Sequence, residues 1–223
     1  MILLKNGHIC PVASEPFVGD LLLDGNRIAA LGSSLDAPEA TTIDVSGCWV
    51  LPGIIDAHCH IGMFEDGMGD EGADGNEYSD PITPEMRAID GLNPFDPCFA
   101  EARTAGVTTV VTGPGSANVI GGQFAALKTA GGSVEEMLIR FPVAMKAAMG
   151  ENPKRAYAEQ KASPYTRMAI AALFRKAILD AKEYAQAKAE AEKDASKKPD
   201  LDLGLEALLP VLRGELPLKV HAH

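Results

Sequence analysis

Residues 51–60, Leu-Pro-Gly-Ile-Ile-Asp-Ala-His-Cys-His, decide how this chain of 223 residues is interpreted. A Pro-Gly pair breaks the chain just before an apolar run that is typical of a buried strand. Residues two apart on a strand share one face, so His58 and His60 project together while Cys59 points the other way. Neutral imidazoles are good ligands for zinc and similar ions. The segment therefore predicts a strand that carries two metal ligands.

The alternative is that the two histidines only satisfy hydrogen bonds inside a core. The flanking sequence favours the metal site, because a polar, glycine-rich stretch follows the strand. Both imidazoles then lie at the carboxyl end of a parallel strand, where barrel enzymes build their active sites. Asp56, two residues before His58 on the same face, is a candidate to orient one imidazole through its second nitrogen.

The sequence on either side of this segment indicates two kinds of structure. Residues 1–52 contain short apolar runs separated by turn signals such as Asp24-Gly25-Asn26, which predicts a small β unit with a hairpin. From residue 53 onward, strands alternate with helices, which favours parallel βα units. Helices are expected at 97–105, after Ser133, at 166–194 and at 203–212.

Five barrel-type strands are expected, at 54–58, 107–112, 123–129, 141–147 and 216–221. A closed parallel barrel needs eight strands and about 250 residues. We therefore expect an α/β fold in which residues 1–52 form part of a small β-sandwich and residues 53–223 form the first five units of a (β/α)₈ barrel, that is, a truncated chain or fragment. An open sheet exposes an unpaired edge, which favours self-association into a homo-oligomer.

Composition excludes several classes of partner. The chain has 31 acidic against 20 basic residues, a formal charge of −11, and its cations are scattered, so nucleic acid is not expected as a partner. No apolar run approaches the roughly 18 residues that span a membrane. Four isolated cysteines and the absence of a secretion signal favour a reduced, cytoplasmic protein.

Together with residues 51–60, several further stretches resemble one family. They are Ala105 to Val110, the glycine-rich stretch 113–122, Gly150-Glu-Asn-Pro-Lys154 and Val220 to His223. In this order, over essentially the whole chain, they resemble the metal-dependent amidohydrolase superfamily, in particular its imidazolonepropionase-related branch. The resemblance implies an elliptical (β/α)₈ barrel with a small β-sandwich. It also implies one or two divalent metals, expected to be zinc, that activate water against an amide-type C–N bond.

The resemblance also implies roles for individual residues. His58 and His60 match the first-strand metal ligands and His221 matches the fifth-strand ligand, with His223 a rival for that role. Lys146 lies where related enzymes carry a carboxylated lysine that bridges two metals. The alternatives for the bridge are that Lys146 is an ordinary lysine whose head reaches solvent, or that Glu151 bridges instead. Relatives take a further His from the sixth strand and a catalytic Asp from the eighth, and neither strand is expected in this sequence.

The function expected from these features is metal-dependent hydrolysis of an amide, cyclic amide or dipeptide bond, with this chain by itself inactive. The alternatives are a catalytically silent structural subunit, or deamination of a heterocycle. Residues 61–86 contain eight acidic residues and neither Lys nor Arg. This stretch forms either a solvated loop or a mouth that attracts cationic substrates such as dipeptides ending in Arg or Lys.

Overall fold

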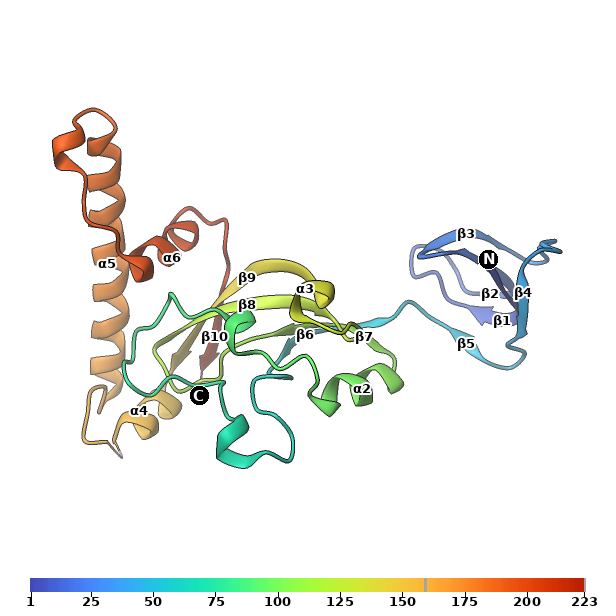
Figure 1. Ribbon diagram of the computed structural model, residues 1–223, viewed down its shortest axis with the longest axis horizontal. Helices are drawn as coiled ribbons and strands as arrows, with labels where there is room; N and C mark the ends of the chain where they lie inside the picture. The colour runs from blue at the N-terminus through green and yellow to red at the C-terminus, as the bar shows by residue number, and fades with distance from the viewer. Residues whose placement is uncertain (159, 223) are drawn as a thin grey trace. The chain divides into compact units, whose positions relative to one another are not determined.

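The computed structural model describes residues 1–158 and 160–222, and the chain divides into two compact units, Met1–Gly53 and Ile54–His223. Figure 1 shows the elements of each unit. The smaller unit contains five strands, and the larger unit contains five more strands together with all the helices of the described residues. Each unit is described separately below.

The smaller unit is one five-stranded sheet in the order β3-β2-β1-β4, with β5 also paired to β1. Its strands are β1 (Ile2–Ile9), β2 (Phe17–Asp24), β3 (Arg27–Gly32), β4 (Thr41–Asp44) and β5 (Trp49–Val50). The expected hairpin is confirmed: Asp24 pairs with Arg27, and Gly25 adopts the positive φ of 57° that such a turn requires. The described strands of this unit form a single layer, so a two-layer sandwich stays a prediction.

The larger unit contains all five expected barrel-type strands, in one sheet of order β10-β9-β8-β7-β6. They are β6 (Ile54–Cys59), β7 (Val107–Thr112), β8 (Ile120–Lys128), β9 (Leu138–Met149) and β10 (Leu218–Ala222). β6 is parallel to β7, and β9 is parallel to β10. The sheet is therefore consistent with part of a barrel.

The direction of β8 corrects the expectation of parallel βα units throughout, because β8 runs antiparallel to both of its neighbours. The reason lies in the connections. Only residues 113–119 join β7 to β8, and residues 129–137 join β8 to β9. A parallel crossover needs a dozen or more residues, whereas an antiparallel return needs very few.

Side-chain caps begin several helices of the larger unit, among them the two expected at Asp96 and Ser133. Asp96 accepts a hydrogen bond from the Cys98 N–H at 2.9 Å, and Ser133 and Thr166 cap two further helices in the same way. The helices are α1 (Ala88–Gly91), α2 (Pro97–Thr104), α3 (Val134–Met137), α4 (Glu151–Ala158), α5 (Arg167–Ala191) and α6 (Leu203–Leu212), with 3-10 turns at Gly69–Gly72 and Ala195–Lys197. Within the described ranges, no helix combines the length and apolar character needed to cross a bilayer.

Two apolar clusters hold the sheet of the larger unit in place. The first packs Val110 and Leu127, from β7 and β8, against Phe99 of α2. The second packs strand residues such as Met145 against α5 and α6, where Leu208 is almost completely buried. These clusters fix β8 and β9 at the centre of the sheet.

The first prediction concerns this core. Leu127→Ala removes a side chain that is 0% exposed in β8, and we expect it to lower the free energy of unfolding by about 2–5 kcal/mol, because it leaves a cavity. Leu179→Ala makes the same chemical change on α5, where the side chain is 56% exposed, and should change stability by about 0.5 kcal/mol or less. Urea denaturation of both variants measures the difference. Equal effects would contradict the assignment of β8 to the core.

Candidate metal centre

Strand β6 places the two predicted imidazoles side by side. The ring centroids of His58 and His60 are 5.2 Å apart, with the rings edge to face. Both rings lie against Phe124 of β8, at centroid distances of 5.2 and 6.2 Å. The two imidazoles therefore share one face of β6, as their two-residue spacing predicts. On that face they lie close to Phe124 of β8, the central strand of the sheet.

His60 is oriented by the glycine-rich loop after β7. Its Nδ1 lies 2.7 Å from the carbonyl oxygen of Gly113. A carbonyl oxygen only accepts hydrogen bonds, so Nδ1 carries the hydrogen and Nε2 keeps its lone pair. This is the tautomer in which an imidazole ligates a metal while its other nitrogen is held by a backbone carbonyl.

Asp56 does not have the orienting role that its spacing suggested. Its Oδ1 accepts a hydrogen bond from the backbone N–H of His58 at 3.0 Å. The carboxylate therefore fixes the backbone of β6, while the Gly113 carbonyl supplies the contact to an imidazole. Side-chain spacing on one strand could not reveal this partner, because Gly113 belongs to the next strand connection.

Burial and nearby positive charge keep both imidazoles neutral. Burial, then the charge of Lys146, lowers the pKa of His58 to about 4, with smaller contributions from His60 and Lys219. Burial also lowers the pKa of His60, although its bond to Gly113 opposes the shift. At neutral pH both rings are therefore in the form that binds a cation.

Lys146, on β9, is completely buried at 0% exposure. Among the described residues, its Nζ has no hydrogen-bond partner, and it lies 5.8 Å from the centroid of the Phe124 ring. Burial, followed by the charge of Lys219, lowers the pKa of Lys146 to about 8. The alternative of a lysine whose head reaches solvent is therefore wrong.

Lys219 is a member of this cluster that the sequence analysis missed. It pairs directly with Lys146 across β9 and β10, so both side chains leave the sheet on the same face. Its Nζ donates a hydrogen bond to the carbonyl of Ala57 on β6 and lies 5.1 Å from the centroid of Phe124. The available signal was its position two residues before His221 on one strand.

His221 lies farther along β10, level with Ala148 of β9. Its Nε2 is 3.3 Å from Nδ2 of Asn152, the second residue of α4. Within residues 1–158 and 160–222, no three His, Cys, Asp or Glu side chains are close enough to bind one metal ion. His58, His60 and His221 therefore do not form a ready three-ligand cluster, and the rival ligand His223 lies outside the described residues.

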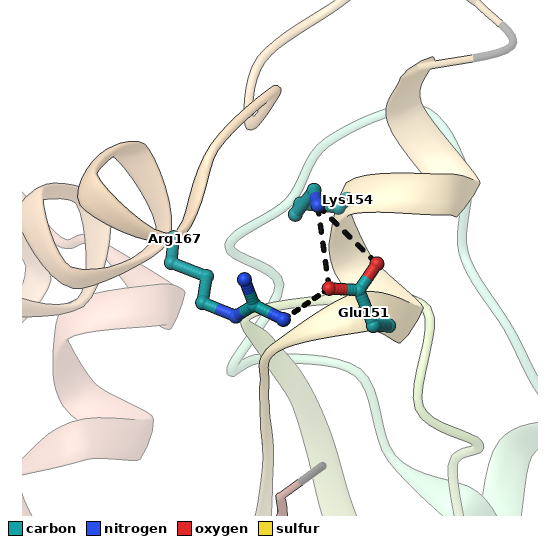
Figure 2. A network of polar contacts seen from close by, with 3 residues as sticks. All are labelled: Glu151, Lys154 and Arg167. Atoms are coloured by element: carbon teal, nitrogen blue, oxygen red, sulfur yellow. Dashed lines mark hydrogen bonds and ion pairs between the residues drawn. The ribbon is translucent and has the colours of Figure 1, made fainter.

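Glu151, the other candidate for a bridging acid, has different partners. It is the first residue of α4 rather than part of a turn, and its carboxylate pairs with Lys154 at 3.2 Å and with Arg167 of α5 (Figure 2). The hydrogen bond and charge of Lys154 lower its pKa. These contacts favour Lys146 over Glu151 as the group next to the imidazoles.

Comparison with known proteins finds that this chain is similar to amidohydrolases in sequence and in structure. The chain matches no protein-family model. A crystal structure described as an amidohydrolase from Thermotoga maritima MSB8 is 42% identical with a TM-score of 0.95, covering 100% of this chain and 58% of that one.

Two curated sequences extend the comparison. "Amidohydrolase tasK" of Hapsidospora irregularis is 33% identical over 93% of this chain and 23% of its own length. A dihydroorotase of Streptococcus pyogenes is 43% identical over 62 residues, which is 27% of this chain and 15% of the relative. The chain thus spans less than two thirds of each of these proteins.

The second prediction concerns the titration of His58 in metal-free protein. Lys146→Met removes a positive charge that disfavours the imidazolium, so we expect the pKa of His58 to rise from about 4. Lys128→Met, at the far end of β8, is the matched control and should leave it unchanged. In the unaltered protein, His58 takes up its proton at lower pH than in the unfolded chain, so its contribution to stability is lost as the pH falls from about 6.5 toward 4.

NMR titration of the ring protons measures both pKa values, with acid denaturation followed in parallel. Two results would contradict this electrostatic account: a His58 pKa near 6.5 in the folded protein, or a His58 pKa that is unchanged in Lys146→Met.

Proposed function

Because the chain belongs to the metal-dependent amidohydrolase superfamily, we propose that it forms the metal-binding part of a hydrolase that cleaves C–N bonds in amides or cyclic amides. The similarity to amidohydrolases and to a dihydroorotase supports this reaction class. The imidazolonepropionase-related branch, a dipeptide substrate, zinc as the metal and a cytoplasmic location are further parts of the proposal.

The observation that carries the proposal is the environment of Lys146. A buried amine without a hydrogen-bond partner is costly, and proteins seldom retain one without a use. A lowered pKa increases the fraction of neutral amine, which is the nucleophile that attacks carbon dioxide. The ammonium first loses a proton to become the neutral amine. The amine nitrogen then bonds to the carbon of carbon dioxide, one C=O π bond opens to leave a negative oxygen, and a second proton is lost to solvent, so that a cationic side chain becomes an anionic carbamate.

The resulting donor set fits a divalent ion. His58 and His60 offer two neutral imidazole nitrogens, and a carbamate on Lys146 offers carboxylate-like oxygens, a combination that resembles catalytic His₂Glu sites. His221, held by Asn152, is proposed as a further ligand. A bound divalent ion supplies activated water and polarises the amide carbonyl. Lys219, which already pairs in register with Lys146, offers a cation close to the new negative charge.

A catalytically silent subunit is the competing function, and an open sheet edge would suit self-association. In the described sheet, β6 and β10 are the two edges, and Ile54 and Ile55 of β6 are 56% and 65% exposed. Such an edge is a template for pairing with another chain. A silent subunit has no need of neutral imidazoles beside a lysine that lacks a hydrogen-bond partner among the described residues. We therefore favour the hydrolase over the silent subunit as the proposed function.

The third prediction tests metal binding by the chain itself. We expect the protein, incubated with zinc and bicarbonate, to retain at least one equivalent of metal after gel filtration, measured by mass spectrometry. His58→Asn removes an imidazole ligand, and Lys146→Met removes the amine, so each should weaken binding at least tenfold. Lys128→Met serves as the matched control for the lysine and should bind like the unaltered chain.

Retention of metal by the His58 and Lys146 variants at unaltered affinity would overturn the assignment of these ligands. A hydrolysis screen with hydantoins, dihydropyrimidines and dipeptides then separates an enzyme from a silent subunit. Turnover of any of these by the metal-loaded protein, lost in His58→Asn, supports the hydrolase. Metal binding without turnover, both in this chain and in a version extended past residue 223, supports the silent subunit.

A further inference from the structure

A cavity of about 490 Å³ lies beside α4. Its polar lining residues are Asn76, Tyr78, Ser116, Asn152, Arg155 and Gln160. The described residues that line it include no Asp or Glu, although the chain as a whole carries a charge of −11. A neighbouring cavity, by contrast, is lined by Asp74, Glu77, Glu85 and Asp90. The cavity beside α4 is thus cationic and rich in hydrogen-bonding groups within an acidic protein.

Buried hydrogen bonds hold the three walls of this cavity together. Asn118 and Tyr157 are each 1% exposed. The Tyr157 hydroxyl donates to the carbonyl of Asp80 at 2.7 Å, and the Asn118 amide donates to the same carbonyl at 2.8 Å. These bonds tie α4 and the loop after β7 to the segment that contains Asn76 and Tyr78. These contacts bring together the segments that line the cavity.

One lining residue of the cavity contacts a candidate metal ligand, and the loop that forms another wall holds a second ligand. Asn152 lines the cavity and lies 3.3 Å from the ring of His221. The loop that contributes Ser116 begins at Gly113, whose carbonyl holds the ring of His60 at 2.7 Å. A molecule in the cavity would therefore lie next to groups that orient two of the proposed ligands.

Arg155 supplies the charge. Asn152, Arg155 and Ala156 share one face of α4, because residues three and four apart are neighbours on a helix. Glu151, one turn before Arg155, is already paired with Lys154 and Arg167 (Figure 2). Within residues 1–158 and 160–222, Arg155 itself takes part in no ion pair. Its side chain is exposed, and its charge contributes only after Lys154 and Arg167 to the lowered pKa of Glu151. The guanidinium can therefore bind a planar anion with two parallel hydrogen bonds.

We propose that this cavity binds the carboxylate of the amide substrate, with Arg155 as its ionic partner and Asn76 and Asn152 as neighbouring polar contacts. The substrate class is therefore an amide that carries a free carboxylate near the scissile bond. The inference rests on the proposed hydrolase function and narrows its substrates. This substrate class includes dipeptides that end in Arg or Lys. Such a dipeptide could place its carboxylate in the cavity and its cationic side chain near the acidic stretch 61–86.

The fourth prediction uses two probes of nearly the same size and shape, N-acetylglycine, which carries a carboxylate, and N-acetylglycinamide, which carries a neutral carboxamide in its place. Binding to the ¹⁵N-labelled chain is followed by NMR in the presence of EDTA, so that no metal contributes. We expect the acid to shift the Arg155 Nε–H signal and to bind roughly ten- to hundredfold more tightly than the amide, because a hydrogen bond to a charged group is strong.

Arg155→Gln should abolish this preference, and Arg155→Lys should retain part of it. Arg175→Gln is the matched control: it makes the same change at an exposed position of α5 and should bind like the unaltered chain. Equal affinity for acid and amide, no binding of either, or full discrimination by Arg155→Gln would each overturn the proposal. Because EDTA removes metal, failure here leaves the metal-binding test of the proposed function unaffected.

Discussion

The buried amine of Lys146 is the constraint around which the candidate site is arranged. Taking an ammonium group out of water without a partner is expensive. Among the described residues, its Nζ has no hydrogen-bond partner, and it lies over the face of Phe124 near the cation Lys219. Burial, and in addition the charge of Lys146, lowers the pKa of His58 and of His60 and keeps both rings neutral. The buried amine thus adds to the effect of burial on its neighbours and gives the site the capacity to gain an anionic ligand.

Much of the fold could be predicted from local sequence. The five sheet strands, the hairpin at Gly25 and the capped helices follow from apolar runs, turn residues and capping side chains that act within a few positions. The direction of β8 could also have been predicted, because residues 113–119 are too few for a parallel crossover. The expectation of alternating βα units was wrong at β8, because it did not take the short length of this connection into account.

Residue spacing alone predicted the candidate site only where one strand determines it, and Lys146 and His221 were expected from the family resemblance instead. The spacing of His58 and His60 fixes their shared face, and β6 carries them as expected. Contacts of Lys219 with Ala57, of Gly113 with His60 and of Asn152 with His221 join segments that are far apart in the chain. They depend on strand register and sheet curvature, which no local pattern encodes. The surroundings of Lys146 likewise come from other strands, such as Phe124 of β8 and Lys219 of β10.

The most direct test of this account asks whether Lys146 becomes a carbamate. The protein is equilibrated with zinc and ¹³C-bicarbonate, and ¹³C NMR is used to detect a protein-bound carbamate carbon. The account predicts one such signal in the unaltered protein and in Lys128→Met, and none in Lys146→Met. Absence of the signal in metal-loaded protein, or its persistence without Lys146, would contradict the central claim.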